Sequence, residues 1–137
     1  MVGSNPVAVS VDLTGVHVLI VEDDEDSRQL LGTFLEYCGA LVTTCHSTES
    51  ALEDLGEYRP HVVVSDLSLP GADGLQLIRA LRKLARDAGG DVPAIAVSAY
   101  DKDFTATEAK AAGYTGYLVK PVNLEEMATL VRDLLDS

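Results

Sequence analysis

The chain has 137 residues, and its 47% hydrophobic and 23% charged residues are typical of one globular domain rather than a disordered segment. The formal net charge of −12 and the lack of any basic run exclude a surface that binds nucleic acid through its phosphates. Aspartate or glutamate interrupts every apolar stretch, so we expect no membrane-spanning helix and no membrane contact by this domain.

The first residues differ in composition from the rest. Residues 1–14 include glycine, serine, asparagine and proline, so we interpret them as a tail or linker and expect one domain over 15–137. They lack the pattern of a signal peptide. Cys38 and Cys45 have neither zinc-ligand nor CxxC spacing, and we expect reduced thiols in a cytoplasmic protein.

Four elements are predicted in the first half of the chain. An apolar run indicates a strand at 16–21, and apolar spacing of three and four residues indicates a helix at about 26–38. A weaker strand at 41–45 precedes a second helix, which Ser47 caps and which runs to Leu55. The apolar side chains of the first helix are Leu30, Leu31, Phe34, Leu35 and Cys38.

The second half continues the same alternation. Turn residues at 69–74 predict a loop, and Asn123 with Glu126 three residues later forms a capping box for the last helix. The predicted elements are strands at 61–66, 94–98 and 117–119, and helices at about 75–85, 105–112 and 124–135.

Five strands alternating with five helices predict an α/β fold. Uninterrupted apolar strands such as 62–64 are typical of a parallel sheet that is buried on both faces. Right-handed crossovers then place helices on both sides of the sheet. We therefore expect a doubly wound, five-stranded parallel sheet in a three-layer α/β/α sandwich.

Polar signals follow four of the predicted strands. Glu22 and Asp23 follow the first strand, Asp66 ends the third, Ser98 ends the fourth, and Lys120 follows the fifth. Parallel strands bring these groups to one edge of the sheet, where open α/β folds place their sites. Three acids, a hydroxyl and a lysine suit a divalent cation together with a phosphoryl group.

These segments resemble the response-regulator receiver domains of two-component signalling over most of the chain, about 16–135. The matching pieces, in the family's order and spacing, are IVEDD at 20–24, VSDLSLPGADG at 64–74, VSA at 97–99, and Gly113 with YLVKP at 117–121. The resemblance implies a flavodoxin-like fold with strand order 2-1-3-4-5.

The resemblance implies a phosphoacceptor and a metal site. Asp66 is the expected nucleophile that carries the acyl phosphate. Mg²⁺ is the expected cofactor because it prefers an oxygen-only pocket shared with a phosphate. Asp23, Asp66 and the Ser68 carbonyl are expected to bind the metal directly, and Glu22 to act through a bound water.

Lysine and hydroxyl groups complete the expected site. Lys120 and the Ser98 hydroxyl are expected to contact phosphoryl oxygens, together with backbone N–H groups near Leu67 and Ala99. In the family the lysine–proline peptide is cis. Tyr117 matches the family's aromatic switch, which turns inward as the hydroxyl residue moves toward the phosphate.

The expected role is a signalling switch rather than a turnover enzyme. A sensor histidine kinase or a histidine phosphotransfer protein would supply the phosphoryl group, and the domain would accelerate only its own phosphorylation and dephosphorylation. The face made by the fourth helix, fifth strand and fifth helix would contact an output partner. We expect a monomer or weak dimer.

Other interpretations of the residues remain open. The acidic run 22–26 taken alone is compatible with a solvated helix start, and Lys120 taken alone with a surface lysine. An aspartyl phosphatase would usually carry a second aspartate where Ser68 stands. A phosphate-independent module with the same fold is a further alternative, and residues 12–19 resemble linkers that enter receivers in hybrid sensor kinases.

Overall fold

The computed structural model describes residues 11–68, 74–99 and 106–136. Most of the loop predicted at 69–74, and the first residue of the helix predicted at 105–112, lie outside this part of the chain. The elements are β1 (His17–Val21), α1 (Glu25–Tyr37), β2 (Leu41–Cys45), α2 (Thr48–Tyr58), β3 (Val62–Asp66), α3 (Gly74–Arg82), the 3-10 helix η1 (Arg86–Ala88), β4 (Ala94–Ser98), α4 (Ala106–Ala112), β5 (Gly116–Val119) and α5 (Leu124–Asp136).

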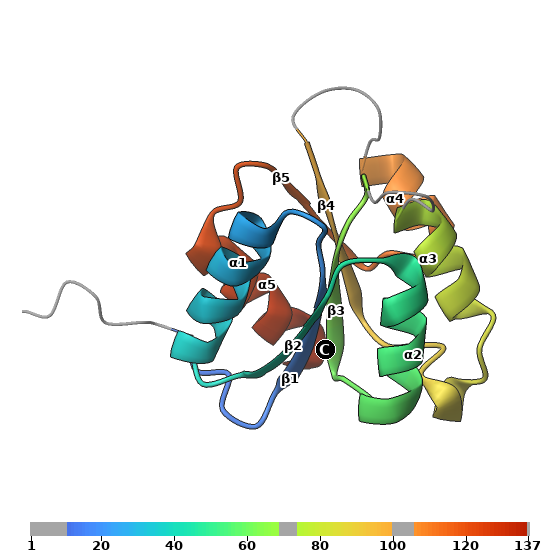
Figure 1. Cartoon of the computed structure of the whole chain (residues 1–137), viewed down its shortest axis with the longest axis horizontal. Helices are drawn as coiled ribbons and strands as arrows, with labels where there is room; N and C mark the ends of the chain where they lie inside the picture. Colours follow the sequence, from blue (N-terminus) through green and yellow to red (C-terminus); the bar gives the residue numbers. More distant parts are fainter. Residues whose placement is uncertain (1–10, 69–73, 100–105, 137) are drawn as a thin grey trace, which may run out of the picture.

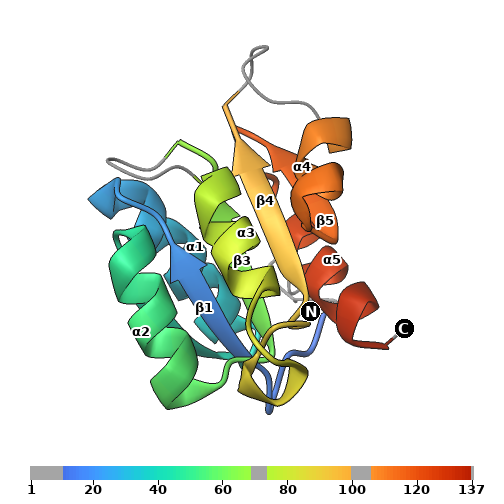
Figure 2. The ribbon, with the colours of Figure 1, turned by 90° about the vertical axis from the view of Figure 1, so that its right-hand side faces the viewer.

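The strands form one parallel sheet in the order β2-β1-β3-β4-β5. Helices α1 and α5 cover one face, and α2, α3 and α4 cover the other (Figures 1 and 2). Every residue of β1, β3 and β4 is buried, as the uninterrupted apolar runs indicate for strands packed on both faces. The predicted fold class and strand order are confirmed.

Helix starts follow the predicted caps. The Ser47 side chain accepts a hydrogen bond from the N–H of Ser50, and the Asn123 side chain accepts one from the N–H of Glu126. Each satisfies a backbone donor that the first turn leaves without an intrahelical partner. At α1 the cap is Asp24, whose carboxylate accepts from the N–H of Ser27.

Helix α1 differs from its predicted stripe at one position. Leu31, Leu35 and Cys38 are buried in the core, whereas the Leu30 side chain is 58% exposed. Positions 31, 35 and 38 share one helix face, and Leu30 lies about 100° away from it, as 3.6 residues per turn requires. The exposed side chain borders an apolar groove between α1 and the start of α5.

Helix α3 ends at Arg82, earlier than the apolar spacing at 75–85 predicts. Here the N–H of Leu84 donates to Leu81, so the last turn tightens to a three-residue spacing. The N–H of Gly90 then donates to the Ala85 carbonyl. These contacts turn the chain toward β4, which explains why the helix stops although its apolar pattern continues.

The ordered core begins before β1. Leu13 lies inside the segment predicted as a tail, yet it is fully buried, and its N–H donates to the Cys38 carbonyl at 2.8 Å. Cys38 and Cys45 are free and buried. None of the helices in the described ranges combines the length and apolar character that crossing a bilayer requires.

Candidate functional site

The predicted polar groups gather where the strands end. Pairing aligns Val21 with Ser65, Asp66 with Val97, and Ser98 with Val119. Because the neighbouring strands are parallel and in register, the residues at or just beyond their carboxyl ends share one edge of the sheet. That edge carries Glu22, Asp23, Asp66, Ser98 and Lys120.

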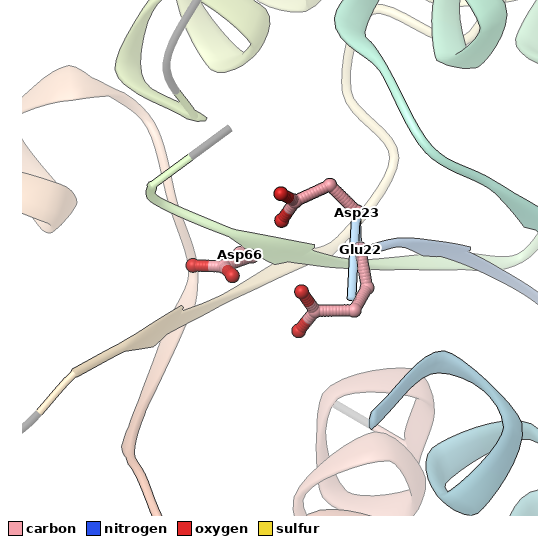
Figure 3. Close-up of side chains that lie close together, drawn as sticks. All are labelled: Glu22, Asp23 and Asp66. Atoms are coloured by element: carbon pink, nitrogen blue, oxygen red, sulfur yellow. The ribbon is translucent and has the colours of Figure 1, made fainter. Parts of the chain in front are cut away.

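Three carboxylates form the centre of the site. One carboxylate oxygen from each of Glu22, Asp23 and Asp66 lies within 4.8 Å of the other two. Figure 3 shows the three side chains close together, two from the end of β1 and one from the end of β3. Glu22 and Asp66 are buried, at 1% and 4% exposure, whereas Asp23 is exposed. The cluster is therefore open to solvent on the Asp23 side.

Lys120 contacts two of these carboxylates. Its Nζ donates to Oδ2 of Asp66 at 3.0 Å and lies 3.3 Å from Oε1 of Glu22. Burial lowers the pKa of Lys120, but its hydrogen bond to Asp66 and the charges of Asp66 and Glu22 outweigh this effect and raise the pKa. The lysine therefore stays positively charged at neutral pH beside the predicted nucleophile.

Burial makes the charged form of the Glu22 carboxylate unfavourable. Burial, with the neighbouring charge of Asp66, raises its pKa to about 7 despite an opposing hydrogen bond from the N–H of Asp24 and the charge of Lys120. Its Oε1 is buried and accepts no hydrogen bond, although Lys120 lies close enough for an ion pair. A buried anionic oxygen without a hydrogen bond is unfavourable unless a cation compensates it.

The residues fit a hard divalent cation. Their ligand atoms are carboxylate oxygens, which Mg²⁺ prefers, and the exposed Asp23 side leaves room for the waters that Mg²⁺ retains. The buried Glu22 oxygen accepts no hydrogen bond and has one positive charge nearby, from Lys120, which is less than the negative charge that the three carboxylates carry together. The chemistry of the donor set therefore supports magnesium as the group that this site would hold.

One backbone amide and the Lys120 side chain hold the two oxygens of the Asp66 carboxylate. The N–H of Ser68 donates to Oδ1 of Asp66 at 2.9 Å, and Lys120 contacts the other oxygen. The N–H of Leu67 instead donates to the Val97 carbonyl at 2.9 Å, within the sheet edge. Of the two amides that follow Asp66, the Ser68 amide is therefore the one that faces the carboxylate.

Ser98 is buried at the end of β4, and its hydroxyl donates to the Ala99 carbonyl at 3.3 Å. Its carbonyl accepts from the N–H of Lys120, so these two predicted site residues are adjacent. Tyr117 is partly buried and packs against the core on the α3–α4 side of the sheet. The Lys120–Pro121 peptide is cis, as the resemblance implied.

An apolar groove adjoins the site. It has a volume of about 430 Å³ and extends from Glu22 and Lys120 across α1 to the start of α5. The exposed side chain of Leu30 forms part of its wall. The remaining lining residues are Ser27, Leu31, Val97, Pro121, Val122 and Leu124.

Sequence reasoning did not identify Arg28. Its Nη1 donates to the Glu22 carbonyl at 2.9 Å, which ties α1 to the acidic turn. An arginine on an exposed helix face carries no signal of such a contact. Two histidines make contacts at the sheet: the N–H of His17 donates to Nδ1 of His61, and the His17 ring pairs with Thr43.

Comparison with known proteins identifies the family. A model of the response regulator receiver domain matches residues 18–132. An uncharacterized 14.6 kDa protein from the sodA1 3′ region of Leptolyngbya boryana is 38% identical over 120 residues, covering 88% of this chain and 90% of that protein. The response regulator MprA of Mycobacterium ulcerans is 35% identical over 88% of this chain, which spans only 50% of MprA.

Solved structures agree in fold. A response regulator from Chloroflexus aurantiacus superimposes with a TM-score of 0.83 at 27% identity, covering 89% of this chain and 98% of that one. The receiver domain of the sensor histidine kinase PA1611 from Pseudomonas aeruginosa gives 0.81 at 26% identity, covering 90% and 100%. That structure has a magnesium ion coordinated in its active-site cleft.

Proposed function

We propose that this chain, which belongs to the response regulator receiver domain family, accepts a phosphoryl group on Asp66 from a phosphohistidine of a partner protein. The observation that carries the proposal is the arrangement around that carboxylate. Lys120 contacts one oxygen at 3.0 Å, the Ser68 amide holds the other at 2.9 Å, and Glu22 and Asp23 lie beside it. A carboxylate held in this way can act as a nucleophile toward phosphorus.

The proposed transfer is a displacement at phosphorus. A carboxylate oxygen of Asp66 forms the new O–P bond while the P–N bond of the phosphohistidine breaks. The imidazole nitrogen keeps the electron pair of that bond. Lys120 lies beside the Asp66 carboxylate, where its charge would stabilise a phosphoryl oxygen. The Ser98 hydroxyl and the Ser68 and Ala99 amides would contact the other phosphoryl oxygens.

Magnesium would be held by Asp23, Asp66 and the Ser68 carbonyl, with Glu22 acting through a bound water. When bound, the ion neutralises the negative charge that the carboxylates and the phosphoryl group bring together. Without that compensation, Glu22 and Asp66 oppose the approach of an anionic donor. The acidic cluster supports this assignment, as does the magnesium in the PA1611 receiver domain.

The partner we infer is a sensor histidine kinase or a histidine phosphotransfer protein. We infer that the donor protein docks on the groove bordered by Leu30, which offers an apolar contact surface next to Glu22 and Lys120. We infer that the domain acts in the cytoplasm, where its two free cysteines stay reduced, and that it is a monomer or weak dimer.

The output we infer is a change at the α4-β5-α5 face. A phosphoryl group on Asp66 gives the buried Ser98 hydroxyl a new acceptor, in place of the Ala99 carbonyl. Tyr117, on the adjacent strand, would then turn inward and alter this face. The domain would in this way work as a switch that promotes only its own phosphorylation and dephosphorylation, and the shift between two arrangements would carry the signal.

Intact-protein mass after incubation with acetyl phosphate tests this function. We expect one added phosphoryl group in the wild type, dependent on Mg²⁺ and absent from Asp66→Asn. Asp26→Asn, at an exposed position of α1, is the matched control and should label like the wild type. Absence of labelling in the wild type would favour a phosphate-independent module, and labelling that persists in Asp66→Asn would identify another nucleophile.

A further inference from the structure

Helix α4 is weakly anchored to the rest of the domain. Ala109 is its one buried residue in the described range, whereas α5 buries Met127, Ala128 and Val131. Elements with few buried apolar contacts open more easily than the core and are the ones that move in switches. The polar contacts at the end of α4 therefore have a large share in fixing its position.

Tyr114 provides such a contact. It follows Gly113, which ends α4 at a φ of +130°, and its own N–H donates to the Ala109 carbonyl at 3.0 Å. The tyrosine side chain is buried at 3% exposure, and its hydroxyl donates to the Gly74 carbonyl at 2.7 Å. One residue thus joins the end of α4 to the first residue of α3.

Gly74 is in turn packed against the phosphoacceptor strand. Its N–H donates to the Leu67 carbonyl at 2.9 Å. A Cβ on Gly74 would lie 2.6 Å from the Asp66 carbonyl oxygen and 2.7 Å from the Leu67 Cα, so only glycine allows this approach. The backbone of Gly74 therefore cannot shift independently of the backbone that carries Asp66.

Tyr114 also borders the space around the predicted switch residue. Tyr114 and Tyr117 line the same cavity, which has a volume of about 190 Å³. Ala106 and Lys110 of α4 form its other side. A change in the position of Tyr114 therefore reaches both α4 and the surroundings of Tyr117.

We propose that Tyr114 is a positioning residue that couples the backbone after Asp66 to α4 through its hydrogen bond to Gly74. This inference rests on the proposed phosphoacceptor function and adds the route by which the acceptor strand and the α4-β5 surface influence each other. The hydrogen bond stabilises the unphosphorylated arrangement of α4. Removing it raises the population of the alternative arrangement, and by reciprocity it alters the reaction at Asp66.

The test compares Tyr114→Phe with Tyr58→Phe in the whole chain. Tyr114→Phe keeps the buried ring and removes only the hydroxyl, and Tyr58 is a 49% exposed tyrosine on α2. We expect amide exchange in α4 to rise about 3- to 10-fold in Tyr114→Phe, the range that one lost hydrogen bond produces, with exchange in α5 unchanged. The rate of labelling by acetyl phosphate with Mg²⁺ should rise at least about 3-fold by population shift. Tyr58→Phe should match the wild type in both.

Two results for Tyr114→Phe would overturn the proposal. Faster exchange in α4 with an unchanged labelling rate would leave the hydroxyl a purely structural role. Equal acceleration of exchange in α4 and α5 would indicate general destabilisation. Failure of the phosphoacceptor function itself is seen separately, because the wild type would then not label.

A wild-type measurement covers the case in which Tyr114→Phe does not fold. Phosphorylation, or beryllofluoride with Mg²⁺ as its mimic, should change amide exchange at Gly74, the partner of the Tyr114 hydroxyl, together with that of α4. Unchanged protection at Gly74 while α4 changes would show that α4 moves without this link. That result would overturn the proposal without any substitution.

Discussion

Nζ of Lys120 donates a 3.0 Å hydrogen bond to Oδ2 of Asp66, although 54 positions separate the two residues in sequence. They meet because Asp66 ends β3 and Lys120 follows β5, and both strands end at the same edge of the sheet. The raised pKa of Lys120 keeps its ammonium group charged. The proposed nucleophile and its cationic partner are thus in contact without a phosphoryl group.

Replacing this lysine should slow phosphorylation more than it weakens the fold. We expect Lys120→Met to lower the rate of labelling by acetyl phosphate by about 10²–10³-fold, the loss typical of a removed charge-stabilising donor. Lys83→Met, at an exposed lysine after α3, is the control for loss of a positive charge. The rate is measured by intact-protein mass over time. Equal rates in the two variants would contradict a role for Lys120 in the transfer.

Magnesium should stabilise the folded protein through the acidic cluster. A ligand at 100 times its Kd raises the free energy of unfolding by about 2.7 kcal/mol, and we expect a Mg²⁺-dependent rise in Tm for the wild type. Chelation of the metal should reverse it. Asp23→Asn should lose most of this rise, whereas Asp26→Asn, at another exposed acid in the same run, should keep it.

Thermal unfolding at several Mg²⁺ concentrations measures the effect. The rise should depend on the concentration of free Mg²⁺ rather than on ionic strength, so a matched series with NaCl is included. A similar dependence in the wild type and Asp23→Asn would show that the ion binds elsewhere.

The free energy of unfolding should depend on pH through His17, which lies at the sheet edge opposite the site. Burial, with the neighbouring charge of His61, lowers the pKa of His17 below 6.5 in the folded state. As the pH drops, the unfolded chain therefore binds this proton first, and the free energy of unfolding falls from about pH 6.5 down to the folded pKa, below which it levels off. His17→Gln removes that contribution while leaving an amide that can reach Thr43, the present partner of the ring.

Urea unfolding of the wild type and His17→Gln from pH 7.5 to pH 5 checks this dependence. The difference in stability between the two proteins should shrink as the pH falls, because only the wild type loses the histidine contribution. His46→Gln, at an exposed histidine, should show no such trend. A difference that stays constant with pH would contradict the predicted direction.

The sequence predicts the backbone of the site better than its contacts. Apolar runs such as Val62–Val64 must be strands buried on both faces, and parallel strands place Glu22, Asp66 and Lys120 at one edge. Order and spacing of these residues therefore suffice to identify both the fold and the candidate site.

Side-chain partners depend on local geometry that no pattern encodes. Spacing does not show that Arg28 donates to the Glu22 carbonyl, or that the hydroxyl of Ser98 points to the Ala99 carbonyl. The bond from Tyr114 to Gly74 joins residues 40 positions apart, and it requires both a glycine packed on Leu67 and a buried ring. Such contacts follow from packing between elements and not from the pattern within one of them.

The Leu30 side chain should affect the rate of phosphoryl transfer from a protein donor but not from a small-molecule donor. This exposed side chain borders the apolar groove next to Glu22 and Lys120, where we propose that a phosphohistidine partner approaches Asp66. We expect Leu30→Ser to slow transfer from a phosphorylated histidine phosphotransfer domain that labels the wild type by about 10-fold, the effect of losing about 1.4 kcal/mol of apolar contact. Labelling by acetyl phosphate should be unchanged because that donor needs no groove.

Leu41→Ser is the matched control, since Leu41 is a 66% exposed leucine at the start of β2, away from the phosphoacceptor edge. Its transfer rate should equal that of the wild type with both donors. Loss of labelling by both donors in Leu30→Ser would mean that the substitution disturbs the site itself, because α1 also carries Arg28, which contacts the acidic turn. Equal transfer from the protein donor to Leu30→Ser and Leu41→Ser would exclude the groove as the approach surface.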